Sequence, residues 1–391
     1  MQKKWQSGIA WLVVFLISAF VLARLDYYTR DGDSVLYADI ASNLAAKPLM
    51  QWIAPVWVGG LFREHPAGIF FLPALLASFG YPAQQAAYVV NSVYQILSLL
   101  LFARIALSFV EGFESRSLTW MLQLIPLAFV FRIRANHEQA ILMFLLLAIY
   151  ALIKIERSVV WGLVVCFALA AILLIKGMFV VFAILTCIAW IVILKHFDKD
   201  SLNRTHRAVF ALLASIAFMT LVAYFYDVLY KRATGQPFLS FYLGRQLRPA
   251  AVEIPETNPL IQMIYNFFWY ARNLIWYPFP WSLFFIWMCL HSVVTKKMAF
   301  VKDRRMIVAG VLLTLAVVLI YAGAFSFFYR RAGRYIFPAY CFLAAGGALT
   351  AIRSNRWVRE AAQKLDILQP WFSPALWLLL FGLHILNGRF H

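Results

Sequence analysis

Acidic side chains are scarce in this chain, and three of its seventeen lie within one short segment, RDGDSVLYADIASNLA. They are Asp31, Asp33 and Asp39. A carboxylate that accepts a proton from a hydroxyl or an amine acts as a general base, so this cluster is a candidate for acid–base chemistry. The structural alternatives are an N-cap role for Asp33 and a turn role for Asp31, because Asp is favoured at both kinds of position.

Histidines and a further acid stand at two places where they could assist such a base. His65 directly follows an acidic residue, and His137 directly precedes Glu138. A histidine titrates near neutral pH and can move a proton, but it can equally be a polar residue at a membrane interface. Glu138 could orient a substrate, hold a divalent ion or pair with Arg134, and the sequence leaves these three roles open.

Cations form the second group of candidates. Guanidinium groups bind phosphate oxygens in a bidentate manner and lysine acts as a point charge, so a cavity that they share would suit a phosphate or pyrophosphate group on a lipid. The alternatives are lipid headgroup contact or pairing with an acid. Lys176 is distinctive because it is the only charge at an apolar turn, where it needs a partner or a ligand unless it snorkels to the interface. The cations that the topology below places with Asp33 are Arg63, Arg132, Arg134, Lys176, Arg245, Arg248, Arg272, Arg330, Arg331 and Arg334.

The composition excludes a soluble globular protein. Of the 391 residues 63% are hydrophobic and 13% are charged, and the mean hydropathy is +0.76. One compact core cannot bury that much apolar surface, so we expect an all-α polytopic membrane protein in contact with membrane lipids. The net charge of +18 does not indicate nucleic-acid binding, since the basic residues are scattered in short clusters between apolar runs. The four cysteines fall inside apolar runs and are expected to be packing residues.

About eleven apolar runs approach the roughly 20 residues that a helix needs to cross a membrane. The first is expected to be retained as an anchor, because no small-residue cleavage site follows it. The weakest boundary is the turn at Lys176, since merging the runs on its two sides would invert every later loop. The predicted spans cover residues 8–25, 86–109, 117–131, 138–153, 159–175, 177–194, 208–229, 274–293, 306–325, 336–352 and 371–387.

The distribution of positive charge supports this count. With the N-terminus placed in the cytoplasm every inner loop is basic, as the positive-inside rule requires. The chain is then one transmembrane domain over residues 1–391, with outer segments at about 26–85 and 230–273 and no soluble C-terminal domain. The first outer segment is rich in aromatic residues and prolines, which favours juxtamembrane helices. One of these is expected near Asp33, with Leu36, Ile40 and Leu44 on a single face.

Several short motifs follow one another in order along most of the chain. Each is degenerate, and their order is the specific feature. They are Asp33 with Tyr37 and Ala41, the segment Glu64-His65-Pro66, the triplet Asn136-His137-Glu138, the turn Ile175-Lys176-Gly177, the segment Gly235-Gln236-Pro237-Phe238, the pair Pro280-Trp281 and the segment Arg334-Tyr335-Ile336-Phe337-Pro338. This order resembles the C-type integral-membrane glycosyltransferases, a group that includes protein O-mannosyltransferases and the lipid A aminoarabinose transferase.

The resemblance implies an inverting transfer of a hexose or pentose from a polyprenyl-phosphate donor to a hydroxyl or amine of a lipid, glycan or protein. It also implies a site on the outer face of a bacterial cytoplasmic (inner) membrane, in modification of the cell envelope such as lipopolysaccharide. The motif selects Asp33 over Asp31 as the base. The implied site residues are Asp33, Glu138 and Asp31 for catalysis, Lys176, Arg334, Arg63, Arg245 and Arg248 for the donor phosphate, and Tyr37, His65, His137 and Tyr335 as further cavity residues.

Two departures from the group limit what the resemblance carries over. Ser34 stands where many relatives have a second acid, so a divalent metal ion as cofactor is left open. Relatives such as the aminoarabinose transferase also extend into a soluble outer domain after the last span. The rival readings are a transporter or flippase for lipid-linked sugars, another lipid-dependent transferase, and a non-catalytic membrane subunit. A transporter would more often show inverted repeats and charges deep within broken helices.

Overall fold

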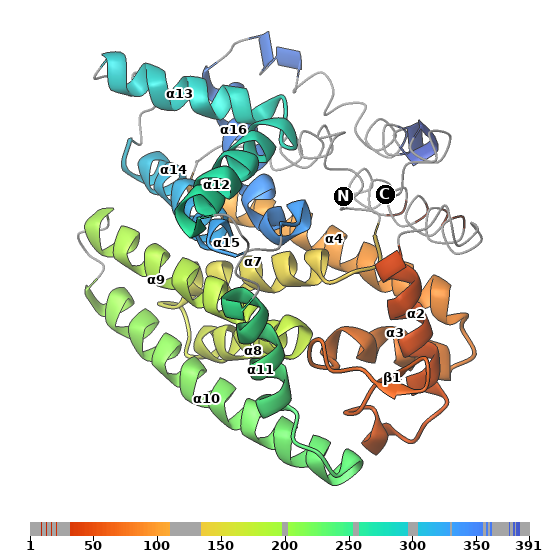
Figure 1. Cartoon of the computed structure of the whole chain (residues 1–391). Helices are drawn as coiled ribbons and strands as arrows, with labels where there is room; N and C mark the ends of the chain where they lie inside the picture. The colour runs from red at the N-terminus through yellow and green to blue at the C-terminus, as the bar shows by residue number, and fades with distance from the viewer. Residues whose placement is uncertain are drawn as a thin grey trace.

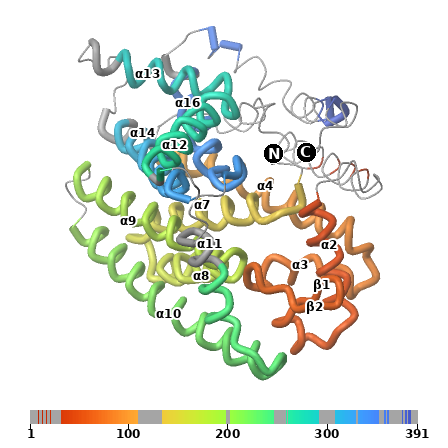
Figure 2. The backbone as a smooth tube through the Cα atoms, in the orientation of Figure 1, coloured from red at the N-terminus to blue at the C-terminus, as the bar shows by residue number. Residues whose placement is uncertain are grey.

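The computed structural model describes residues 32–109, 134–197, 202–252, 258–295, 304–328 and 331–354, together with isolated positions near the two ends of the chain. These residues are almost entirely helical, so the prediction of an all-α fold is confirmed apart from one short hairpin (Figures 1 and 2). The hairpin pairs β1 (Val56–Trp57) with β2 (Gly60–Leu61) in antiparallel register. The predicted spans at 8–25, 117–131 and 371–387 lie largely or wholly outside the described residues.

The predicted first outer segment contains short helices, as expected. It contains α2 (Gly32–Ala45), the 3₁₀ turn η2 (Leu49–Gln51) and α3 (Gly68–Ser78), and it leads into α4 (Ala83–Phe109). Ile40 and Leu44 of α2 are fully buried and Leu36 packs against the same core, which confirms the predicted face. Asp33 is the second residue of α2 and therefore not its N-cap, and its carboxylate contacts other segments of the chain.

The middle of the chain forms a bundle around one buried helix. Figure 1 shows α7 (Glu138–Lys154) crossing the centre of the molecule, and it packs against α8 (Val160–Lys176), α9 (Phe179–Phe197) and α4. Nearly all of its side chains are buried, which agrees with a sequence that is apolar on every face of the helix. α10 (Leu202–Thr234) covers α8 and α9 from outside. The predicted break at Lys176 is confirmed, since α8 ends there and α9 turns back along it.

The last third of the described chain departs from the predicted spans. The segment predicted as a loop at 230–273 is mainly helical, because α11 (Leu239–Val252) and α12 (Pro259–Trp276) lie within or across it. The span predicted at 274–293 is broken, and α12 and α13 (Trp281–Thr295) meet at an angle of 104°. Pro278 and Pro280 occupy the break, and proline cannot donate the backbone hydrogen bond that a continuous helix needs. The remaining elements are α14 (Arg304–Val318), the π-helical turn η4 (Leu319–Gly323), α15 (Ala324–Ser326), the 3₁₀ turn η5 (Gly333–Ile336) and α16 (Phe337–Ser354).

Within the described residues four helical stretches are long and apolar enough to cross a membrane, or five if the bent α12–α13 pair counts as one span. The predicted count of about eleven is therefore not confirmed. Large apolar side chains on α10 point away from the protein, and Phe210 and Leu213 are 74% and 60% exposed. An apolar surface of this kind is stable in contact with lipid and not with water.

The contact between α3 and α8 requires a glycine. A Cβ atom on Gly68 would lie 2.7 Å from the carbonyl oxygen of Leu174, in the last turn of α8. We expect Gly68→Ala to destabilise the protein by about 1–3 kcal/mol, because backbone must move to make room. The measurement is the thermal unfolding midpoint, with Gly244→Ala as control because a Cβ there meets no atom within 4 Å. A midpoint of Gly68→Ala equal to that of the wild type would show that α3 and α8 can move apart without a loss of stability.

Candidate active site

The candidate residues come from segments that are far apart in the sequence and meet at the N-terminal end of α7. Figure 1 shows α2 and α3 beside this end of α7. The contributors are Asp33 and Tyr37 on α2, His65 before α3, His137 and Glu138 at the start of α7, Lys176 at the end of α8, and Arg334 and Tyr335 on η5. The fold thus gathers the acids, histidines and principal cations that the sequence motifs singled out.

Asp33 is held in place by two donors from different segments. Its Oδ2 atom forms an ion pair with Nη1 of Arg334 and accepts a hydrogen bond from Nδ2 of Asn136 at 3.1 Å. Both contacts use Oδ2, so neither of them occupies Oδ1. The side chains of Asp33 and Arg334 are 34% and 27% exposed, so both can be reached from outside the protein.

Ser34 and Asn136 fix the backbone next to this ion pair. Ser34 Oγ accepts a hydrogen bond from the backbone N–H of Ala135 at 3.0 Å, and Asn136 Oδ1 accepts one from the N–H of His137 at 2.7 Å. The serine that replaces the second acid of the motif therefore joins α2 to the segment before α7. The sequence analysis recorded Ser34 only as a departure from the motif and gave Asn136 no separate role. The contacts of Ser34 with Ala135 and of Asn136 with Asp33 join residues about one hundred positions apart, so local patterns do not reveal them.

A hydrogen-bonded chain of three buried side chains lies behind Asp33. His65 Nδ1 donates to the carbonyl of Pro66 at 3.1 Å, so in neutral His65 the Nε2 atom must accept. It accepts from the Tyr37 hydroxyl at 2.8 Å, and the Tyr37 oxygen in turn lies 3.1 Å from Nδ1 of His137. If Nδ1 of His137 donates to Tyr37, its Nε2 is an acceptor, and this buried atom has no hydrogen-bond partner among the residues that the structure describes.

The surroundings of the two histidines keep them neutral. Burial lowers the pKa of both well below the usual value, and the positive charge of Lys176 lowers them further. Aromatic rings enclose the pair, with Phe70 stacked on His65 and Phe179 edge-on to His137. In the neutral form each ring has one donor and one acceptor, which suits directed hydrogen bonding to a hydroxyl.

Lys176 occupies a turn whose shape is fixed from α11. Gly177 has a positive φ of 50°, and a Cβ there would lie 2.3 Å from the hydroxyl oxygen of Tyr242. That hydroxyl accepts a hydrogen bond from the N–H of Met178 at 3.0 Å and lies 3.4 Å from the carbonyl of Lys176. The Lys176 charge interacts with the carboxylates of Glu138, which is buried, and Glu64. Lysine and carboxylates therefore share this end of the bundle.

The remaining predicted cations lie at the edge of the cluster or outside the described residues. Arg63 Nε donates to the Tyr230 hydroxyl at 3.2 Å, and its guanidinium lies 4.7 Å from the ring centre of Phe241. Arg245 pairs with Glu64 at 3.2 Å on the surface, where such pairs contribute little to stability. These two arginines connect the first outer segment to α10 and α11.

Of the other predicted site residues, one lies at the site and two lie outside the described part of the chain. The two are Asp31 and the side chain of Arg248. Tyr335 belongs to the aromatic wall of the site, since its ring stacks on Phe325 and meets Phe179 edge-on. In the portion of the chain that the structure describes, no three His, Cys, Asp or Glu side chains come together as metal ligands.

Comparison with solved structures shows that the fold is shared with ArnT from Cupriavidus metallidurans. Its structure bound to undecaprenyl phosphate aligns with a TM-score of 0.65 at 14% identity over 92% of this chain, and its apo structure with 0.60 at 15% over 89%. The Archaeoglobus fulgidus oligosaccharyltransferase in the apo form aligns with 0.48 at 11% over 97%.

The resemblance that the ordered motifs indicated is confirmed at the level of the fold. This chain spans 63% and 60% of the two ArnT chains and 56% of the oligosaccharyltransferase. No protein-family model matches the sequence, and no curated protein matches it significantly.

The neutral histidines predict a pH dependence of stability. Because the pKa of His65 and of His137 is lowered on folding, the unfolded chain binds more protons than the folded one as the pH falls below about 6.5. The free energy of unfolding is therefore unaffected by these histidines above that pH and decreases below it. The limiting slope is about 1.4 kcal/mol per pH unit for each histidine. We expect the thermal unfolding midpoint to fall on acidification, and to fall less steeply in His65→Gln. Identical slopes in the two proteins would contradict a neutral buried His65.

Proposed function

We propose that the chain is an inverting glycosyltransferase that moves a sugar from a polyprenyl-phosphate donor to a hydroxyl or amine. The observation that carries this proposal is the meeting of an accessible carboxylate, Asp33, with Arg334 and Lys176 at one end of the bundle. A fold shared with a transferase solved in complex with undecaprenyl phosphate supports it. Cations beside a carboxylate suit a reaction that needs a base and a stabilised phosphate leaving group.

In the proposed reaction Asp33 is the general base. Its Oδ1 atom takes the proton from the acceptor as the acceptor oxygen or nitrogen forms a bond to the anomeric carbon of the sugar. The bond between that carbon and the donor phosphate oxygen breaks, and the electron pair leaves with the lipid phosphate. Arg334 and Lys176 stabilise the charge that develops there, because fixed cations aimed at a leaving group lower the barrier. Arg334 uses Nη1 for Asp33, so its other N–H groups can bind phosphate.

The neighbouring residues are assigned supporting roles. The open Nε2 acceptor of His137 would take a hydrogen bond from a sugar or acceptor hydroxyl, with Tyr37 and His65 setting its tautomer. Glu138 holds the Lys176 ammonium by opposite charge. The donor phosphate would enter past Arg63, Arg245 and Tyr335. The ordered motifs also imply roles for Asp31 and Arg248, which lie outside the described part of the chain.

The proposal includes a location. With about eleven spans and the N-terminus in the cytoplasm, the N-terminal end of α7 faces the outside of a bacterial inner membrane. The acceptor would then be an envelope component such as a lipid-linked glycan, lipopolysaccharide or a secreted protein. Mass analysis of envelope glycolipids with and without the gene would identify the transferred sugar and its acceptor together. An envelope without any change in glycan mass would count against a role in envelope modification.

Removal of the base should abolish turnover. Asn has the shape of Asp and can keep one contact with Asn136 or Arg334, but it cannot accept a proton, so Asp33→Asn should lower kcat by about 10²–10⁴-fold. The measurement is release of polyprenyl phosphate from a polyprenyl-phosphate-sugar donor in proteoliposomes. Asp39→Asn is the matched control, because Asp39 lies on the exposed side of the same helix. Full turnover in Asp33→Asn would show that another group is the base.

A transporter of lipid-linked sugars is the second candidate, and the sharp bend between α12 and α13 favours it. Broken helices near charged groups are typical of transporter sites. The same proteoliposomes separate the two functions, since a transporter would move the labelled donor across the bilayer without releasing free polyprenyl phosphate. The transferase proposal predicts cleavage of the donor that depends on added acceptor.

A further inference from the structure

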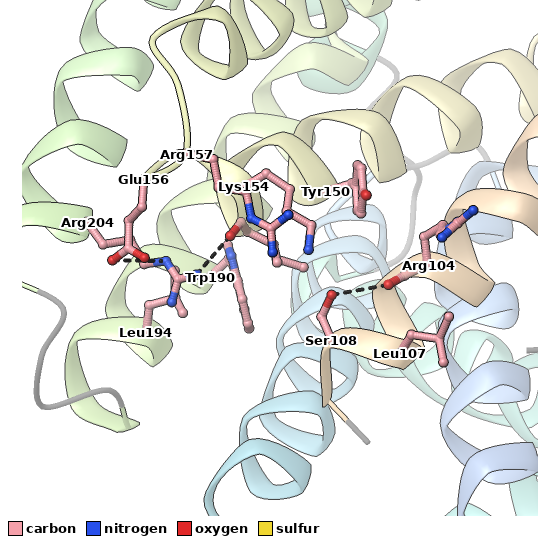
Figure 3. Close-up of a pocket in the computed structure, with 11 residues that line it drawn as sticks. Arg104, Leu107, Ser108, Tyr150, Lys154, Glu156, Arg157, Trp190, Leu194 and Arg204 are labelled. Atoms are coloured by element: carbon pink, nitrogen blue, oxygen red, sulfur yellow. Dashed lines mark hydrogen bonds and ion pairs between the residues drawn. The ribbon is translucent and has the colours of Figure 1, made fainter. Parts of the chain in front are cut away.

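A charged cavity lies at the other end of α7, about 24 Å from Glu138 by the rise of the helix. Its volume is about 350 Å³, which is large enough for a phosphate-bearing group. Figure 3 shows the side chains that surround it, drawn from α4, α7, the turn after α7, α9 and α10. This cavity contains none of the residues assigned above to the candidate active site.

The lining of this cavity is strongly cationic. Among the described residues it includes Arg104, Lys154, Arg157 and Arg204 with a single carboxylate, Glu156, so positive charge exceeds negative by three in this part of the lining. Glu156 lies 3.6 Å from Nε of Arg204. The three arginines repel the positive charge of Lys154. An anion bound between these four cations would reduce that repulsion.

The cavity is held open by contacts that do not need a ligand. Arg204 Nη2 donates to the carbonyl of Ile153 at 2.8 Å, and Lys154 Nζ lies 5.5 Å from the ring centre of Tyr150. Trp190 and Leu194 of α9 are buried and line the same cavity. The cations are therefore arranged around a packed apolar base and are pre-organised for an anion.

Charge at the ends of membrane helices can serve topology alone, but that role does not require cations to converge. Lys195 is basic, exposed and close in sequence to Leu194, yet it does not line the cavity. The four lining cations come instead from three helices and a turn and face one space. We propose that this cavity binds a phosphate group, carried either by an anionic phospholipid or by a soluble phosphate, as a site separate from the one that contains Asp33.

The proposal is tested by binding to the full-length purified protein. Native mass spectrometry would compare retention of phosphatidylglycerol with that of phosphatidylcholine, and calorimetry would measure binding of inorganic phosphate. We expect Lys154→Gln/Arg157→Gln to weaken phosphate or phosphatidylglycerol binding by roughly tenfold or more, since it removes two charged contacts. Lys195→Gln is the matched control and should bind as the wild type does.

The two probes distinguish the sources of the phosphate. Selective loss of phosphatidylglycerol in the double variant indicates a lipid headgroup, and loss of inorganic phosphate binding alone indicates a soluble ligand. Equal binding of both probes by the wild type and the double variant overturns the proposal, and so does an equal loss in Lys195→Gln. If the double variant does not fold, Arg104→Gln is tested in its place, because Arg104 is exposed at the rim and its change should still weaken binding severalfold.

Discussion

The ion pair between Asp33 and Arg334 is the interaction on which the candidate site depends. It joins α2 to η5, and Asn136 adds the segment before α7. The two charges are partly removed from water, so each needs the other, and loss of one partner would leave an uncompensated charge. Both contacts use Oδ2 and orient the carboxylate of Asp33. The proposed catalysis therefore depends on the atoms that join these three segments.

The first outer segment is positioned by α10 and α11. The Tyr226 hydroxyl accepts a hydrogen bond from the N–H of Ala67 at 3.0 Å and donates to the carbonyl of Ile53 at 3.1 Å. Asp227, one residue later, accepts hydrogen bonds from the N–H groups of Phe238 and Leu239 at the start of α11. α11 then provides the tyrosine that holds the Lys176 turn. α10 thus positions the first outer segment directly, and it positions the Lys176 turn through α11.

The sequence predicted the local features well and the distant contacts poorly. Apolar periodicity identified α2, the buried α7 and the break after Lys176, because these depend on nearby residues. It missed the helices at 239–252 and 259–273, where polar and aromatic residues interrupt the apolar pattern, and the bend that Pro278 and Pro280 introduce. The ordered motifs selected Asp33, Lys176 and Arg334. They could not show that Ser34 binds the N–H of Ala135, since that contact exists only in the folded chain.

The central claim is that Lys176 and Arg334 bind the phosphate of a polyprenyl carrier beside Asp33. The most direct test is the affinity of the purified protein for polyprenyl phosphate, measured for the wild type, Lys176→Gln and the distant control Lys195→Gln. The claim predicts that Lys176→Gln binds at least about tenfold more weakly, because it loses one charge-assisted contact, while Lys195→Gln is unchanged. Wild-type affinity in a folded Lys176→Gln would contradict it.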